Sequence, residues 1–272
     1  METVSARGDE VPALGLGTWQ LTGEQCYESV STALELGYRH LDTAQMYENE
    51  REVGRAVDAA AVDRDDVWIT TKVTPGNARY DDVLESTRAS LDRLDTGYVD
   101  LLLLHWPNPL VDFADTARAM AELRDDGLIR HAGVSNFRRW RLGKAREKSP
   151  VPLLADQVRC HPFYTRESLR EDCVANDQVL TAYSPLAHSG VVGDDRLERI
   201  GERYDRTAAQ VALRWATQRE GCVAIPKATS REHLAANLAA LEFELTAAEM
   251  DAVASPSLVR TASLLIRNEL TA

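Results

Sequence analysis

The stretch YRHLDTAQMYENE, residues 38–50, changes from an apolar run to a polar segment. Residues 38–43 have the length of a buried strand. The residues that follow, REVGRAVDAA (51–60), place apolar side chains at every third or fourth position, which is typical of an amphipathic helix. The stretch therefore predicts a strand that passes into a helix, with an acid, Asp42, and a phenol, Tyr47, at the junction.

The same strand-to-helix unit recurs along the chain. Strands are expected at residues 13–18, 38–43, 67–73, 98–105, 129–136, 154–160, 179–184 and 222–227. Helical periodicity lies between them, most clearly at residues 26–36, 51–60, 81–94 and 208–218. Eight units without a linker predict an α/β protein, a single (β/α)8 TIM barrel that forms one domain over residues 1–272.

A doubly wound open sheet is the structural alternative. Its one support is GLGTWQ (15–20), in which Gln20 stands where a dinucleotide-binding loop needs its third glycine. A tight turn after the first strand explains this stretch better.

Local signals add detail at both ends of the chain. Residues 4–11 read as a β-hairpin that turns at Arg7-Gly8-Asp9 and covers the N-terminal end of the barrel. Extra C-terminal helices are expected after the eighth strand. Capping boxes predict three helix starts, at Thr22 with Gln25, Thr207 with Gln210 and Thr246 with Glu249.

The charge balance limits the partners. The chain has 43 Asp and Glu against 31 Lys and Arg, a net charge of −12. Such an acidic protein argues against nucleic acid and anionic membranes, so the expected partner is a small molecule. Nearly all the positive charge is arginine. This composition fits a salt-rich, halophilic cytoplasm, and a GC-rich genome explains it equally well.

The compartment follows from what the sequence lacks. Its four cysteines, Cys26, Cys160, Cys173 and Cys222, show no metal-ligand spacing, so we expect reduced, buried thiols and no metal site. No secretory signal and no apolar run of about 18 residues is present. A cytoplasmic protein is therefore expected.

Chemically active side chains stand at three neighbouring strand ends. Asp42 and Tyr47 follow the second strand, Lys72 ends the third and His105 ends the fourth. Active sites of parallel barrels form at this end of the strands. A phenol with a pKa near 10 needs help to protonate a carbonyl oxygen at neutral pH. We expect Asp42 to keep Lys72 charged, Lys72 to make Tyr47 acidic, and a neutral His105 to orient the substrate oxygen.

At these residues the sequence resembles the aldo-keto reductase family, and the resemblance covers nearly the whole chain. It implies an eightfold barrel that transfers a nicotinamide hydride to an aldehyde or ketone, with Asp42, Tyr47, Lys72 and His105 as a catalytic tetrad. The matching stretches are LGLGTWQ, GYRHLDTAQMYENEREVG, VWITTKV, YVDLLLLHWP, IRHAGVSNF, DQVRCHP, AYSPL and IPKATSREHLAANL.

The resemblance also implies a cofactor site for NADP(H), with NAD(H) as the alternative. Ser135, Asn136 and Gln157 match the carboxamide contacts, and Tyr183 matches the aromatic residue that stacks on the nicotinamide. Ser184 and Leu186 match backbone contacts to the pyrophosphate, Lys227 the cation on the 2′-phosphate, and Asn237 an adenine contact. The further positions implied are Gly17, Thr18, Asp42, Pro185, Ala228, Thr229 and His233.

The chain departs from the family pattern at three positions, and two of the departures weaken the 2′-phosphate contacts. Ala228 replaces a serine, His233 replaces an arginine, and Ala236 stands where an acid often precedes the asparagine. A neutral imidazole binds phosphate less well than a bidentate guanidinium. We therefore expect binding of NADPH through Lys227 with a reduced preference over NADH.

The substrate pocket is expected to be aromatic and open, lined by Trp19, Tyr47, His105 and Trp106. The loop after HWP and the tail after Ser255 are both short. The resemblance is greatest to the prokaryotic branch that acts on diketo-sugar acids, methylglyoxal-type dicarbonyls and simple aldehydes.

Three other functions are alternatives to carbonyl reduction: a sugar or alcohol dehydrogenase, a nucleotide-binding regulatory subunit, and a metal-dependent hydrolase. For the hydrolase, the required clusters of metal ligands are missing from the strand ends.

Overall fold

Eight parallel strands form one sheet in the computed structural model, which describes residues 2–254. They follow one another in chain order: β3 (Leu16–Gly17), β4 (His40–Asp42), β5 (Trp68–Val73), β6 (Val99–Leu104), β7 (Ile129–Ser135), β8 (Leu153–Arg159), β9 (Val179–Tyr183) and β10 (Cys222–Ile225). All eight expected strands are present. Each lies within its predicted range or extends past it by one residue, and the first is much shorter than predicted.

The first and last strands meet and nearly close the barrel. Gly15 N donates to Ala224 O at 2.8 Å, and Gly17 N donates to Pro226 O at 3.0 Å. A Cβ on Gly17 would lie 2.8 Å from Ile225 O, so only glycine allows this approach. The GxG pair therefore serves barrel closure, and the open doubly wound sheet is excluded.

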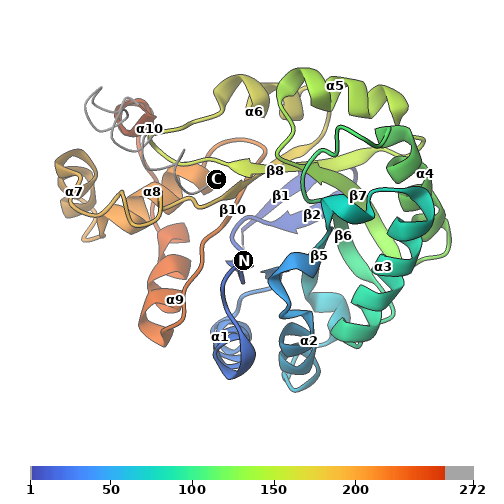
Figure 1. Cartoon of the computed structure of the whole chain (residues 1–272). Helices are drawn as coiled ribbons and strands as arrows, with labels where there is room; N and C mark the ends of the chain where they lie inside the picture. The colour runs from blue at the N-terminus through green and yellow to red at the C-terminus, as the bar shows by residue number, and fades with distance from the viewer. Residues whose placement is uncertain (1, 255–272) are drawn as a thin grey trace.

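Helices surround the strands (Figure 1). Those that follow the strands are α1 (Gly23–Leu36), α2 (Glu50–Asp58), α3 (Tyr80–Leu94), α4 (Phe113–Asp125), α5 (Arg139–Lys148), α6 (Glu167–Val174), α8 (Ala208–Thr217) and α9 (Arg231–Leu238). Additional helices are α7 (Asp195–Glu202), before α8, and α10 (Ala247–Ala254), beyond the barrel. Short 3₁₀ turns are η1 (Gln45–Tyr47), η2 (Arg64–Asp66), η3 (Pro75–Asn77) and η4 (Ala239–Leu241).

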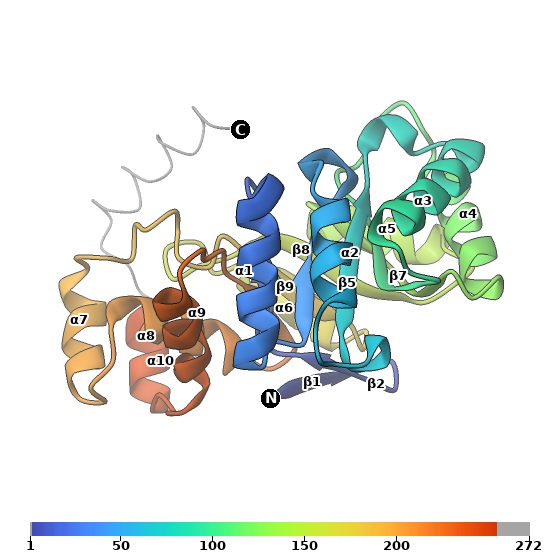
Figure 2. The ribbon, with the colours of Figure 1, turned by 90° about the horizontal axis from the view of Figure 1, so that it is seen from below.

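The N-terminal hairpin covers one end of the barrel, as predicted (Figure 2). Strands β1 (Thr3–Ala6) and β2 (Asp9–Pro12) pair antiparallel around Arg7 and Gly8. Ala6 and Val11 pack in one buried apolar cluster with Trp68, Leu101, Leu154, Val179 and Val223 from the barrel interior. The predicted site residues lie at the opposite, carboxyl end of the strands.

Two of the three predicted capping boxes form. Thr207 and Gln210 exchange hydrogen bonds at the start of α8, and Thr246 and Glu249 do so at the start of α10. The box predicted at Thr22 is wrong, because that side chain makes no cap hydrogen bond. Gly23 follows it with φ +52°, so the first turn of α1 is not regular and Gln25 N is not presented to the hydroxyl.

The four cysteines are free and buried, as expected. Between residues 2 and 254, no helix is both long enough and apolar enough to cross a membrane. In the same range, no three His, Cys, Asp or Glu side chains are grouped so that they could hold a metal ion.

Candidate active site

The centre of the carboxyl end is a buried ion pair between β4 and β5. Lys72 Nζ lies 2.5 Å from Asp42 Oδ1 and also donates to Thr43 O at 2.7 Å. The lysine side chain is fully buried and the aspartate side chain is 2% exposed. Burial has the largest single influence and lowers the pKa of Lys72, but the charges of Asp42 and Tyr47 and the hydrogen bonds to both together raise it more, so the net shift is upward. Lys72 is therefore charged at neutral pH, as predicted.

Tyr47 completes the contact from the 3₁₀ turn η1. Lys72 Nζ donates to Tyr47 Oη at 3.4 Å and lies 4.8 Å from the centre of its ring. Burial raises the pKa of Tyr47, and the nearby Lys72 charge lowers it only in part, so the net shift is upward. The expectation that Lys72 makes this phenol acidic overall is thus wrong, because desolvation of phenolate outweighs the ammonium. The lysine still acts in the expected direction.

His105 stands beside Tyr47 at the end of β6. The two rings meet edge to face, with centroids 5.6 Å apart. Burial, and then the Lys72 charge, lower the pKa of His105 to about 3. The imidazole is neutral at pH 7, as predicted. Its Nδ1 is buried and has no hydrogen-bond partner within the described chain.

Polar side chains from β7, β8 and β9 continue the site. Gln157 Nε2 donates to Asp42 Oδ2 at 2.6 Å, so the second carboxylate oxygen is also bound. Ser135 donates to Gln157 O at 2.8 Å. Tyr183 donates to Asn136 Oδ1 at 2.9 Å, and Asn136 Nδ2 donates to His105 O at 3.1 Å. The predicted carboxamide and stacking residues therefore form one network with the tetrad.

Thr18, which follows β3, is hydrogen-bonded to the main chain of Asp42 on β4. Thr18 is buried, and both its N and its Oγ1 lie 2.9 Å from Asp42 O, to which they donate. Among the described residues, this arrangement contains no triad of metal ligands. Its titratable groups are one carboxylate, one ammonium, one phenol and one neutral imidazole. Such a set can hold and deliver a proton beside a polarised oxygen.

A profile of the Aldo/keto reductase family matches residues 13–256. The chain belongs to the aldo-keto reductase family. An aldo-keto reductase of Mycolicibacterium smegmatis is 38% identical over 249 residues, which cover 91% of this chain and 90% of the relative. The methylglyoxal reductase DkgB of Salmonella typhi is 38% identical over 248 residues, 90% of this chain and 92% of the relative.

Solved structures agree with this assignment. The crystal structure of a putative 2,5-diketo-D-gluconic acid reductase B has a TM-score of 0.91 and 40% identity. The match covers 93% of this chain and 90% of that chain. The protein is thus an oxidoreductase that reduces carbonyl compounds, in a family that typically depends on NAD(P)H.

The reductase carries the remaining predicted cofactor positions between β9 and α9. Ser184, Pro185 and Leu186 follow β9, and Ser184 has φ +49°. Lys227 is exposed just after β10, and it donates to Gln20 at 3.3 Å and lies 5.9 Å from the Trp19 ring. Ala228 is buried and Thr229 exposed; on α9, His233 is exposed and Asn237 is buried.

The aromatic rim of the reductase is half open. Trp19 is 46% exposed and Trp106 is 47% exposed, as a wall of an open pocket requires. The predicted short C-terminal tail lies outside the described residues. The sequence did not single out Thr43, whose main-chain oxygen binds Lys72, because a backbone contact leaves no trace in residue type. Gln157 was predicted as a carboxamide contact, and the structure adds its bond to Asp42.

Proposed function

We propose that Tyr47 gives the proton to the carbonyl oxygen of the substrate and that Asp42, Lys72 and His105 support this step. The observation that carries the proposal is the position of Lys72 Nζ, between Asp42 Oδ1 at 2.5 Å and Tyr47 Oη at 3.4 Å. A phenol that has lost its proton becomes phenolate beside an ammonium. The Lys72 ammonium is fully buried and stabilises the phenolate, so it lowers the barrier to proton transfer.

The other side chains hold this geometry. Asp42 keeps the buried lysine protonated, and Gln157 and the strand hydrogen bonds fix the carboxylate. A neutral His105 can donate one hydrogen bond to the substrate oxygen next to Tyr47, since an imidazole with a pKa of about 3 is uncharged over the working range. NAD(P)H, when bound, supplies the hydride.

The residues present fit a dinucleotide along the carboxyl end. A side-chain amide (Asn136), a half-buried aromatic ring (Tyr183) and an exposed cation (Lys227) lie at the ends of β7, β9 and β10. We infer that NADP(H) is the cofactor and that Lys227 binds its 2′-phosphate. His233 is a weaker phosphate ligand than arginine, so the preference over NADH should be modest. A kcat/KM ratio in the thousands in favour of NADPH would contradict this.

The substrates proposed are small aldehydes and dicarbonyls, in view of the relative named as a methylglyoxal reductase and the half-exposed Trp19 and Trp106. Diketo-sugar acids are included because the similar solved structure is that of a putative 2,5-diketo-D-gluconic acid reductase. Oxidation of a sugar or alcohol is the alternative direction, since the cofactor ratio sets it. The proposal places the enzyme in the cytoplasm as a monomeric, single-domain protein.

The test compares the wild-type enzyme with Tyr47→Phe. We expect the variant to bind NADPH normally and to lose about 10²- to 10⁴-fold in turnover, the range that a general acid contributes. NADPH oxidation against methylglyoxal and neutral aldehydes measures turnover, and quenching of protein fluorescence measures cofactor binding. A Tyr47→Phe enzyme that keeps most of its turnover would overturn the assignment of the proton donor.

A further inference from the structure

Helix α5 and its N-cap carry a concentration of positive charge that the rest of the chain does not share. Residues 138–148 contain six basic side chains and one acid, Glu147, in a protein with a net charge of −12. Two of the four lysines of the chain, Lys144 and Lys148, lie in this segment. The helix lies on the outside of the barrel, with α4 and α6 on either side of it (Figure 1). It therefore presents a basic surface on a protein that is acidic as a whole.

The placement of these charges does not serve the stability of the helix. Negative charge near a helix N-terminus is favourable because of the helix dipole, and positive charge there is unfavourable. Helices α1, α3 and α4 each have an acid in the first turn, whereas α5 has none. It begins instead with Arg138, Arg139, Trp140 and Arg141. Arg141 and Lys144 are also three positions apart, a spacing at which like charges repel. Helix stability thus does not account for these residues.

Three of the six cations join α5 to the neighbouring helices. Asp172 on α6 contacts both Arg139, at 3.4 Å, and Arg146, at 2.6 Å. Asp112, at the start of α4, contacts Lys148 at 2.6 Å. The helix is therefore held from both sides, and its outward face is a fixed support for the remaining side chains.

The other three cations, Arg138, Arg141 and Lys144, have no acidic partner. Among the described residues, no carboxylate lies within ion-pair distance of them, although Arg138 and Lys144 are exposed and acids are abundant. Between them in the sequence stands Trp140, which is 56% exposed. The Arg141 guanidinium and the Lys144 ammonium lie 5.0 and 5.5 Å from the centre of its ring. We call these four residues the basic patch.

We propose that the basic patch binds an acidic segment of another protein, one that carries an apolar side chain beside its carboxylates. The carboxylates pair with Arg138, Arg141 and Lys144, and the apolar side chain covers the Trp140 ring. Tryptophan and arginine are the residues that contribute most binding energy in protein interfaces. This inference goes beyond the proposed function and does not depend on it.

Charge and size favour an acidic protein segment over other anionic partners. The ten residues of α5 span about 15 Å, the length of one short segment. The net charge of −12 repels an extended polyanion such as nucleic acid wherever that polyanion passes beyond the patch. An anionic membrane needs several apolar side chains on the exposed face of a helix, but Leu142 and Ala145 are buried against the barrel.

The basic patch is separate from the residues of the active site. Among the described residues, its side chains make no hydrogen bond, ion pair or ring contact with Asp42, Tyr47, Lys72 or His105. A partner on α5 therefore occupies the outer wall of the barrel. Substitutions in the patch should leave turnover at the wild-type value.

The test measures binding of a labelled peptide to the full-length enzyme by fluorescence anisotropy, at about 0.15 M salt. The probe is a synthetic peptide that repeats Glu-Asp-Phe-Glu three times. Trp140→Ala should raise its Kd about tenfold or more, and Trp140→Phe should recover part of the affinity. The double variant Arg141→Glu with Lys144→Glu should also raise the Kd at least about tenfold. The matched control is Arg118→Glu with Arg124→Glu, which makes the same change of charge at exposed positions on α4 and should have a much smaller effect.

A second peptide, with lysine in place of every acid, should bind the Arg141→Glu, Lys144→Glu enzyme more tightly than the wild type. The melting temperature of this double variant should not fall, because an acid in the first turn of α5 is favourable. Failure of the acidic peptide to bind the wild type, or an equal loss in the α4 control, would overturn the proposal. Tighter binding of a single-stranded oligonucleotide or of phosphatidylglycerol vesicles through Trp140 would overturn it as well, and would assign the patch to nucleic acid or to a membrane.

Discussion

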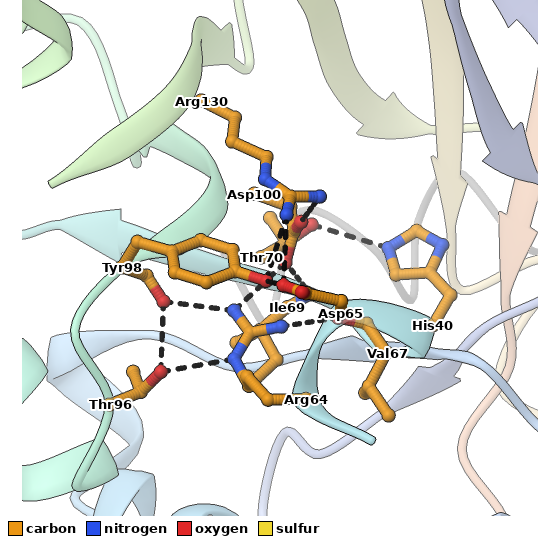
Figure 3. A network of polar contacts seen from close by, with 10 residues as sticks. All are labelled: His40, Arg64, Asp65, Val67, Ile69, Thr70, Thr96, Tyr98, Asp100 and Arg130. Atoms are coloured by element: carbon orange, nitrogen blue, oxygen red, sulfur yellow. Dashed lines mark hydrogen bonds and ion pairs between the residues drawn. The ribbon is translucent and has the colours of Figure 1, made fainter. Parts of the chain in front are cut away.

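Each end of the barrel buries a carboxylate beside a cation, but the two pairs differ in their surroundings. At the carboxyl end, Asp42 pairs with Lys72, and the phenol of Tyr47 shares the lysine. At the amino end, Asp100 at the start of β6 accepts from Arg64 at 2.9 Å and from Arg130 at 3.1 Å (Figure 3). Its Oδ2 also accepts from Ile69 N at 2.8 Å.

The side chains of the amino-end network mainly contact one another. Arg64 donates to Thr96 and to Tyr98 O, and the guanidinium groups of Arg64 and Arg130 lie 4.2 and 4.4 Å from the centre of the Tyr98 ring (Figure 3). Arginine suits this role because it keeps its charge and binds a carboxylate and an aromatic face at once.

At the carboxyl end some buried polar atoms have no hydrogen-bond partner in the described chain. His105 Nδ1 and Arg159 Nε are buried without partners in the described chain, and Trp19 and Trp106 are half exposed. Single unpartnered atoms also occur elsewhere, Trp68 Nε1 at the amino end among them, so the half-exposed tryptophans are what distinguish the carboxyl end. The comparison teaches that the Asp100 network uses its charges to stabilise the barrel, whereas the Lys72 network lies beside a rim that a ligand can approach.

The largest effect is expected from Lys72→Met. Removing one partner of a buried ion pair costs about 3–5 kcal/mol, and turnover should fall by at least about 10²-fold because Tyr47 loses its ammonium. The double variant Asp42→Leu with Lys72→Met should recover much of the stability without the activity. Chemical denaturation and NADPH oxidation measure the two quantities. Equal stability loss in the single and double variants would show that the ion pair itself stabilises the fold.

A smaller effect, on stability only, is expected from Asp100→Asn. The variant loses the charge that two arginines share, and charged hydrogen bonds contribute about 1.5–3 kcal/mol each. Turnover per folded molecule should stay at wild type. The control is Asp126→Asn, which breaks an exposed pair with Arg88 at 3.5 Å and should change the free energy of unfolding by less than about 1 kcal/mol. A large loss of turnover in Asp100→Asn would show that the two ends are coupled.

The smallest effect concerns acid stability at the carboxyl end. The folded-state pKa of His105, about 3, lies below the ordinary 6.5. Its contribution to stability is therefore complete above pH 6.5 and is lost as the pH falls toward 3. Relative to His105→Asn, the wild-type enzyme should lose on the order of 1–2 kcal/mol between pH 7 and pH 5. Urea unfolding at both pH values measures this, and a pH-independent difference would show that His105 titrates normally.

The barrel and the convergence of Asp42, Tyr47, Lys72 and His105 were both predictable, for different reasons. Apolar strand runs and helical periodicity repeat eight times, and the strand ends of a parallel barrel meet on one side, so Asp42, Lys72 and His105 had to converge. The failed cap at Thr22 shows the limit of local patterns, because the φ of Gly23 changed the first turn. Arg159 was passed over because nothing along the chain shows that an arginine lacks an acidic neighbour.

The sequence alone determined the element order and the chemistry available at the strand ends, because these depend on periodicity and residue type. Only the tertiary structure decided how far each pKa moves and which charges remain unpaired. Burial raises the pKa of Tyr47 despite Lys72, and Arg159 Nε is left without a partner among residues 2–254. Both depend on desolvation and on neighbours distant in the chain, and therefore on distances that exist only after folding.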